Sequence, residues 1–320
     1  MATKLRPTVS IGLPVYNGEQ YIRFALDSLL SQDFEDFELI ISDNASTDQT
    51  PAICAAYAKE DRRVRYYHNK ENIGSAPNYN RTFHLASGEY FKWCAHDDTC
   101  RPRFLADCVE AMRAAPSRVA LVYPQCDLID ASGKVFARAP HEPPNTHRYA
   151  FRRLAQVLRN VGYAYPLWGL IRSDHLRRTR LFTPGAVNDY VLLAELALQG
   201  EFWELEAPLI ELRMHERNAW AICSADQGDV AWRDNAKATK RSRENLLAWT
   251  DPKSAHKSLW LPYYEDLYWR YLKGVHHATL PMAHKLVSYV TVPVVCYFRR
   301  VKNFGSLWKR SLLRRLAPGG

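Results

Sequence analysis

Short apolar runs alternate with amphipathic segments over the first 130 residues, and this alternation leaves few folds open to the chain. Five of the apolar runs have the length of buried strands: 9–15, 37–42, 64–67, 90–94 and 119–123. After the first run, one helix face is marked by Ile22, Ala25, Leu26, Leu29 and Leu30. Repeated strand–helix–strand units predict an α/β fold with a mostly parallel sheet flanked by helices.

Polar clusters follow three of these runs, at 16–18, 43–48 and 96–98. In open parallel sheets, ligands bind outside the carboxyl ends of the strands. We therefore expect the three clusters to meet in one ligand site. No G-x-G-x-x-G follows a strand and no G-x-x-x-x-G-K-[ST] occurs, which disfavours dinucleotide binding and P-loop hydrolysis.

The segment His96-Asp97-Asp98 has two readings. Two adjacent carboxylates repel each other unless a positive group lies between them. A divalent cation fills that place, and Mg²⁺ typically uses one or two carboxylates together with substrate phosphates. The alternative is a helix cap, in which Asp98 or Thr99 precedes a helix that begins near Pro102.

The clusters at 43–48 and 16–18 are similarly open. Asp48 or Thr47 can cap the following helix, or Asp43 can accept a hydrogen bond from a nucleobase or ribose. Gly18 suits a tight turn, and Tyr16 can stack on a flat ring.

Taken in order, these segments resemble the family-two glycosyltransferases of GT-A fold, which are inverting enzymes that use nucleotide-sugar donors. The resemblance covers roughly residues 8–216. The matched stretches are 9–17, 39–48, Asn72-Ile73-Gly74 with Asn80, 86–90 and 95–98. It implies a GT-A type fold with a Rossmann-like sheet.

The resemblance also implies roles for individual residues. Donor-binding roles fall on Pro14, Tyr16, Asn17, Asp43, Asn72, Asn80 and Asp97. Asp98 is expected to hold Mg²⁺ or Mn²⁺ on the diphosphate, with His215 closing over the metal or the diphosphate. Ala95 stands where the commonest D-x-D-D form has its first Asp, and His96 is expected not to bind the metal.

An inverting transfer needs a general base that takes the proton of the acceptor hydroxyl. By the resemblance this base is Asp189, and Asn188 replaces the Glu that usually precedes it. The alternative for Asp189 is a helix N-terminal charge that interacts with the helix dipole.

The net charge of +9 belongs to the end of the chain. After Asp266 there is no acidic residue, but there are ten Lys or Arg. Between 304 and 316, basic side chains interleave with an apolar face, as in a helix that lies on an anionic leaflet. The alternative is an amphipathic helix packed on the main domain. No nucleic-acid module accompanies the basic residues, so we expect no nucleic-acid partner.

The sequence thus predicts a GT-A domain over 1–222, with a donor half at 1–130 and an acceptor and base half at 131–222. A helical, basic extension follows over 223–320. The expected partners are a UDP-, dTDP- or GDP-linked sugar and a glycan or lipid-linked acceptor in cell-surface glycoconjugate synthesis.

With no 18-residue apolar run and no secretory signal, we expect a cytoplasmic protein that is peripheral at the inner face of the cell membrane. A non-catalytic nucleotide-sugar or glycan binder is the alternative, and Ala95 and Asn188 favour it.

Overall fold

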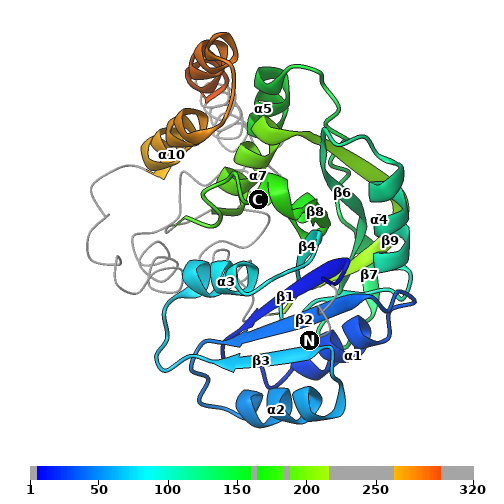
Figure 1. Ribbon diagram of the computed structural model, residues 1–320. Coiled ribbons are helices and arrows are strands. Elements are labelled where there is room, and N and C mark those ends of the chain that lie inside the picture. Colours follow the sequence, from blue (N-terminus) through cyan, green and yellow to red (C-terminus); the bar gives the residue numbers. More distant parts are fainter. Residues whose placement is uncertain (1–5, 160–163, 184–187, 216–262, 297–320) are drawn as a thin grey trace, which may run out of the picture.

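The computed structural model describes residues 6–159, 164–183, 188–215 and 263–296. Within these residues the strands form one nine-stranded sheet in the order β3-β2-β1-β4-β8-β6-β9-β5, with β7 paired to β6. Helices lie on both faces of the sheet (Figure 1). The predicted α/β architecture is confirmed.

Four strands of the donor half are parallel to one another and adjacent in the sheet. They are β1 (Val9–Val15), β2 (Phe37–Asp43), β3 (Val64–His68) and β4 (Tyr90–Trp93). In this register Asp43 pairs with Val15 on one side and with His68 on the other. Because parallel strands end on the same side, the polar loops after them meet at one edge of the sheet.

The connecting helices are α1 (Ile22–Leu30), α2 (Thr50–Glu60), α3 (Ser75–His84) and α4 (Phe104–Ala114). The predicted face of α1 is confirmed, since Ile22, Ala25, Leu26 and Leu29 are buried and Leu30 is half-buried. Gly74 precedes α3 with a φ of 90°, a conformation that L side chains rarely adopt.

The other half of the sheet is mixed. Its strands are β5 (Thr99–Cys100), β6 (Val119–Ile129), β7 (Val135–Arg138), β8 (Leu170–Arg172) and β9 (Glu201–Arg213). β8 lies antiparallel between β4 and β6, whereas β9 is parallel to β6. β9 runs unbroken through two apolar stretches, 202–205 and 209–213, because register shifts near Pro124 and Gln125 of β6 absorb the residues between them.

The remaining helical segments are α5 (Ala150–Arg159), the 3₁₀ turn η1 (Tyr165–Trp168), α6 (Ser173–Leu176), α7 (Asn188–Gln199), α10 (Tyr263–His277) and a helix over 282–296. α5, α7, α10 and the 282–296 helix enclose a second core, apart from the main core on the sheet. In the described part of the chain, no helix has both the length and the apolar character needed to cross a membrane.

α7 belongs to both cores. Leu192, Leu193 and Leu196 face the main core, and Val191, Ala194 and Leu198 face the second core. The expected domain boundary at 222 lies outside the described residues. The second core joins residues from both sides of that boundary.

Candidate active site

The loop after β4 carries Asp97 and Asp98, and the end of β9 holds this loop in place. The main-chain N–H of Arg213 donates to Oδ1 of Asp98 over 2.9 Å. Nε of the same arginine donates to the carbonyl oxygen of Asp97, also over 2.9 Å. Its Nη1 donates to the carbonyl oxygens of Asp130 and Ala131. One buried guanidinium therefore ties three carbonyls of two loops together.

The pKa values of the two adjacent carboxyls are shifted in opposite directions. Burial raises the pKa of Asp97, but His96 and the hydrogen bond from His215 outweigh burial, and the pKa lies below its usual value. The pKa of Asp98 is well above its usual value because burial and the neighbouring Asp97 both disfavour ionisation. The fold therefore favours the ionised form of Asp97 and the protonated form of Asp98.

His215 reaches this pair from the residues after β9. Its Nε2 lies 2.9 Å from Oδ2 of Asp97, and its ring centre lies 4.6 Å from that of Tyr21. The predicted proximity of residues 97, 98 and 215 is therefore present. The ring of His96 lies close to Gly18 of the turn after β1, where an added Cβ would come within 2.6 Å of it.

The carboxylate oxygens of Asp97 and Asp98 are ligand atoms that suit a hard divalent cation. Oδ1 of Asp98 accepts the N–H of Arg213, and its second oxygen, together with the Asp97 carboxylate, would serve a cation as ligands. Mg²⁺ commonly binds one or two carboxylates and completes its shell with phosphate oxygens and water. Among the described residues, no group of three or more His, Cys, Asp or Glu side chains could hold a metal. Most of the ligands would therefore come from the donor diphosphate and water.

Asp189 lies in the first turn of α7. Burial raises the pKa of this carboxyl to about 6, and its Oδ1 accepts the N–H of Tyr190 over 2.9 Å. Tyr79 lies on α3, and the pKa of its phenol is raised by burial and then by the nearby charges of Asp97, Asp98 and, more weakly, Asp189.

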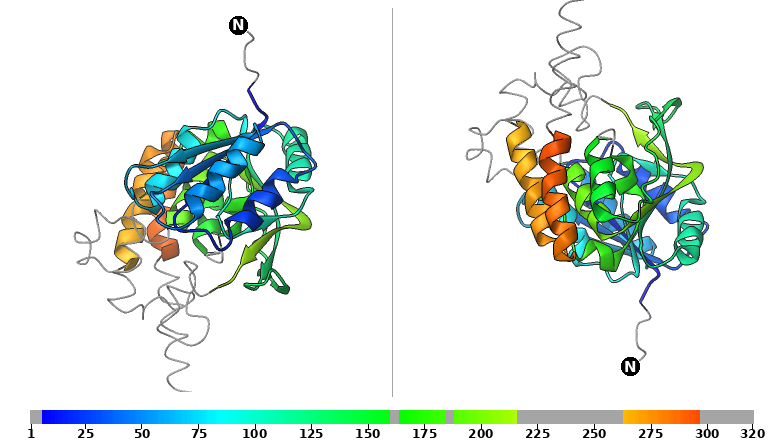
Figure 2. Two further views of the ribbon diagram at one scale, coloured as in Figure 1. Left: turned by 90° about the horizontal axis from the view of Figure 1, so that it is seen from below. Right: turned by 90° about the horizontal axis from the view of Figure 1, so that it is seen from above.

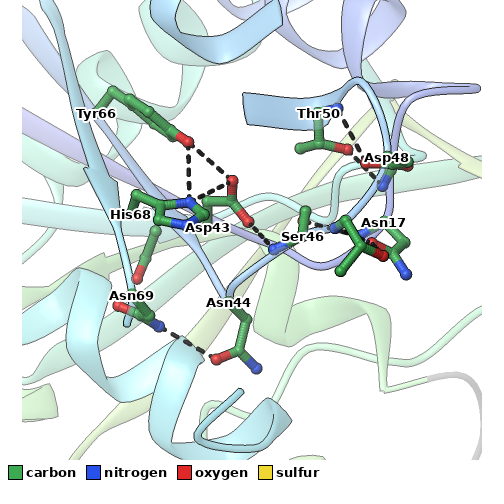
Figure 3. Close-up of polar contacts among 12 residues, drawn as sticks. Asn17, Asp43, Asn44, Ser46, Asp48, Thr50, Tyr66, His68 and Asn69 are labelled. Carbon is green, nitrogen blue, oxygen red and sulfur yellow. Dashed lines mark hydrogen bonds and ion pairs between the residues drawn. The ribbon is translucent and has the colours of Figure 1, made fainter. Parts of the chain in front are cut away.

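The carboxylate of Asp43 is fully buried at the edge of the sheet (Figure 3). Its Oδ1 accepts the N–H of Ser46 over 2.9 Å, and its Oδ2 accepts the Tyr66 hydroxyl over 2.8 Å. Nδ1 of His68 lies 3.1 Å from the same Oδ2. An N–H group of a nucleobase reaches Oδ2 of Asp43 only if it joins or replaces Tyr66 and His68 as a partner. The His68 side chain is 47% exposed and is the partner that can move.

The turn after β1 packs on the start of α2 (Figure 3). Asn17 has a φ of 50°, and its Oδ1 accepts the N–H of Thr47 over 2.9 Å. Oδ1 of Asp48 accepts the N–H of Thr50, the first residue of α2, whereas the N-cap position itself is Gln49, whose side chain makes no capping hydrogen bond. Tyr16 is 43% exposed, so its ring is available for stacking. Pro14 lies within β1, paired in register with Ser42.

A network of amides joins this edge to α3. Asn44 donates to Oδ1 of Asn72 over 2.8 Å, and Asn69 donates to both Asn44 and Asn78. Asn80 lies outside this network. Its Nδ2 donates to the carbonyl oxygen of Phe182 and its Oδ1 accepts the N–H of Phe182. Both polar atoms of Asn80 are therefore bonded to the main chain of Phe182, and its expected role toward the donor stays a prediction.

Sequence reasoning missed several residues of this site, namely Tyr66, His68, Asn69, Asn78 and Tyr79. One signal was present: Tyr66 and His68 alternate along the third strand, so they share a face of the sheet next to Asp43.

The model of the family described as Glycosyl transferase family 2 matches residues 10–180. An uncharacterised glycosyltransferase of Rickettsia bellii is 35% identical over 223 residues, which are 68% of this chain and 31% of the relative. The putative glycosyltransferase EpsH of Bacillus subtilis is 36% identical over 116 residues, 36% of this chain and 33% of that protein. The chain thus spans about a third of the length of these curated relatives.

The fold matches solved transferases. Residues 1–349 of S. aureus TarS in complex with UDP-GlcNAc align with a TM-score of 0.55 at 15% identity, covering 93% of this chain and 89% of that one. The complex with UDP gives a TM-score of 0.54 at 16% identity, covering 92% of each chain. At these identities the likeness shows the GT-A fold.

Proposed function

The chain belongs to glycosyltransferase family 2, and from that membership we propose that it moves a sugar from a nucleoside diphosphate to an acceptor hydroxyl with inversion. One observation carries the proposal. At the carboxyl edge of the parallel strands, Arg213 and His215 hold the loop with Asp97 and Asp98 by hydrogen bonds of 2.9 Å. A buried pair of carboxyls held in this way suits a donor diphosphate, and Asp189, on the helix that precedes β9, is the group proposed for proton removal.

The donor nucleotide belongs at the edge formed by β1, β2 and β3. Tyr16 stacks on the base, Asp43 accepts a base N–H, and Asp97 contacts the ribose or sugar. Pro14, Asn17 and Asn72 line the same edge. UDP is the first nucleotide to test because TarS was crystallised with UDP and with UDP-GlcNAc. The dTDP- and GDP-linked sugars remain candidates.

In the proposed reaction Asp189 is the general base. Its carboxylate takes the proton of the acceptor hydroxyl while that oxygen forms a bond to the anomeric carbon. The bond from the anomeric carbon to the diphosphate oxygen breaks, and its electron pair leaves with the nucleoside diphosphate. With a pKa of about 6, Asp189 is ionised at neutral pH and is still a stronger base than an ordinary aspartate.

Asp98 and His215 are the residues proposed to hold Mg²⁺ or Mn²⁺. His215 would then exchange its bond to Asp97 for the metal or the diphosphate. When bound, the cation supplies electrostatic stabilisation of the charge that develops on the leaving diphosphate. Arg213 keeps the carboxylates in place for this role through its bonds to both residues.

The proposed acceptor is a glycan or lipid-linked sugar at the cytoplasmic face of a bacterial membrane, in cell-surface polysaccharide or glycoconjugate synthesis. The basic segment 304–316, which we propose as a contact to an anionic leaflet, lies outside the described residues.

A thermal-shift panel with UDP, dTDP, GDP and CMP, each with and without Mn²⁺, tests the donor site. A ligand that binds only the folded state at a hundredfold excess over Kd adds about 2.7 kcal/mol to the free energy of unfolding. We expect one diphosphate to raise Tm, and to raise it further with Mn²⁺. A folded sample that responds to none of the nucleotides would contradict the proposal.

A further inference from the structure

The helix over 282–296 presents an exposed apolar stripe. Its members recur every four residues and their exposed fractions are large: Met282 at 70%, Leu286 at 59%, Val290 at 63% and Val294 at 45%. The opposite side of the same helix, with Ser288, Val292 and Val295, is buried in the second core. The helix is therefore fixed to the protein by one side while the other side offers aliphatic groups to solvent.

This stripe borders a groove of about 640 Å³ between the helix and α5. The apolar side chains of Phe151, Ala155 and Val290 line the groove. Arg152 and Arg159 also line it. Figure 2 shows the helix, in dark orange, beside α10 on the outer side of α7. We call the stripe, the groove and these two arginines the outer face.

The charge of the outer face has one sign. Neither 145–159 nor 267–296 contains an Asp or Glu. Arg148, Arg152 and Arg159 are exposed, and none of them forms an ion pair with a described residue. A surface with aliphatic groups at its centre and unneutralised guanidinium groups beside them is complementary to a layer that is apolar inside and anionic at its boundary.

We propose that the outer face docks on an anionic lipid bilayer. Leu286 and Val290 enter the boundary between headgroups and acyl chains, and Arg152 and Arg159 bind lipid phosphates. A second copy of the chain fits less well, because a two-fold interface through this face would set the same arginines against each other. A soluble polyanion would leave the aliphatic stripe in water.

Docking on this face bears on catalysis through α7. The helix that carries Asp189 packs on α5 and α10 in the second core, one layer beneath the outer face. The catalytic base is thereby held at a fixed distance from the bilayer, close to a lipid-linked acceptor. This consequence rests on the proposed acceptor, whereas the docking itself does not.

Flotation of the full chain with vesicles tests the docking. One set is phosphatidylcholine alone, and the other contains about 30 mol% phosphatidylglycerol, an anionic lipid that attracts basic side chains. We expect the protein to float only with the anionic set and to be released by salt. Absence of flotation with the anionic set overturns the proposal.

Two double variants assign the binding to the outer face. Leu286→Ser with Val290→Ser removes aliphatic groups that make no core contact, and Arg152→Gln with Arg159→Gln removes charge alone. Each basic side chain near an anionic surface contributes about fivefold to membrane affinity. The arginine variant should therefore bind the anionic vesicles about 25-fold more weakly than the parent. The matched control, Val135→Ser with Phe136→Ser, alters two exposed apolar residues on β7 and should float as the parent does.

Flotation that both outer-face variants retain would assign binding to other residues and overturn the proposal. A parent dimer that the Leu286→Ser, Val290→Ser variant converts to a monomer would identify a second copy as the occupant. Circular dichroism of each variant excludes unfolding. Sugar transfer to a soluble acceptor without vesicles reports the proposed chemistry separately, and the outer-face variants should leave it unchanged.

Discussion

The main-chain N–H of Arg213 donates to Oδ1 of Asp98 across 115 positions of sequence, at 2.9 Å. This bond joins the last residue of β9 to the loop after β4, and the side chain of Arg213 adds a bond to the carbonyl of Asp97. The proposed metal ligand is thus oriented by a strand from the other half of the sheet. The two halves of the domain meet at this contact.

Arg213→Lys should therefore weaken both the fold and donor binding. Lysine keeps the charge but cannot reproduce the planar fork that binds three carbonyls. We expect a loss of about 2 to 4 kcal/mol in the free energy of unfolding and weaker binding of UDP with Mn²⁺, measured by denaturation and calorimetry. Arg118→Lys is the control, since Arg118 is 66% exposed and its pair with Glu201 should contribute less than about 1 kcal/mol.

Asp98→Asn should remove the metal dependence of donor binding. The asparagine has the shape of the protonated acid but cannot become an anion for a cation to bind. Transfer should fall by about 100-fold or more, and Mn²⁺ should no longer enlarge the thermal shift with UDP. Without metal, the variant should lose little stability because the fold favours the protonated form of Asp98, which the amide resembles. Asp33→Asn, an exposed carboxylate, serves as the control. An unchanged Mn²⁺ effect in Asp98→Asn would assign the metal elsewhere.

Asp189→Asn should abolish transfer and leave donor binding intact. Loss of a general base typically costs about 10² to 10⁴ in rate, whereas UDP should bind within about twofold. In the parent, kcat should fall as the pH drops through about 6, because only the ionised carboxylate accepts a proton. Asp174→Asn, with a side chain 79% exposed, should keep full activity. A fully active Asp189→Asn variant would refute the assignment of the base.

The same substitution should stabilise the protein at high pH. The folded-state pKa of Asp189 is raised from 3.8 to about 6, so folding favours the protonated acid, and the ionised form costs stability. That cost begins near pH 4 and is complete above pH 6. Two pKa units correspond to about 3 kcal/mol at most. Denaturation of parent and Asp189→Asn at pH 4.5 and pH 8 should show the larger gain at pH 8.

At the base-binding edge, Asp43→Asn and Tyr66→Phe should behave differently. Asp43→Asn replaces a carboxylate with three partners by an amide, and UDP affinity should fall by about tenfold. Tyr66→Phe removes one hydroxyl from Oδ2 and leaves that oxygen open to the base, so affinity should stay within about threefold. Calorimetry with UDP measures both. Equal losses would mean that Tyr66, and not the carboxylate alone, contacts the nucleotide.

The sequence predicted the donor half well because its signals are local. The apolar run at 9–15 has the length of a buried strand, and Ile22 and Leu26 recur with helical spacing. Both predictions match the structure, in β1 and α1. The short strand β8 has three residues, too few to show a period, so its antiparallel insertion between β4 and β6 was missed. Where pairing partners are far apart in sequence, composition gives no guide to their order in the sheet.

The candidate site was predictable only where a motif fixes it. Asp97 and Asp98 stand at a strand end, and His215 was found through the resemblance. The hydrogen bond between Asn80 and Phe182 spans 102 positions of sequence, and no local sequence pattern predicts it. The Asn80 side chain was therefore assigned to binding of the nucleotide-sugar donor. Tyr66 and His68 reach Asp43 through the register of β2 and β3, which a single sequence does not state.

The double role of α7 has a consequence for recombination between relatives. One side of this helix is fitted to the sheet and the other to α10 and the 282–296 helix. A chimera that exchanges α10 and the 282–296 helix alone would place foreign side chains against Val191 and Leu198. A functional exchange must therefore include α7, and Asp189 is then exchanged with it. The proposed catalytic base, α10 and the 282–296 helix are therefore expected to be inherited together, as one unit of exchange in the evolution of such transferases.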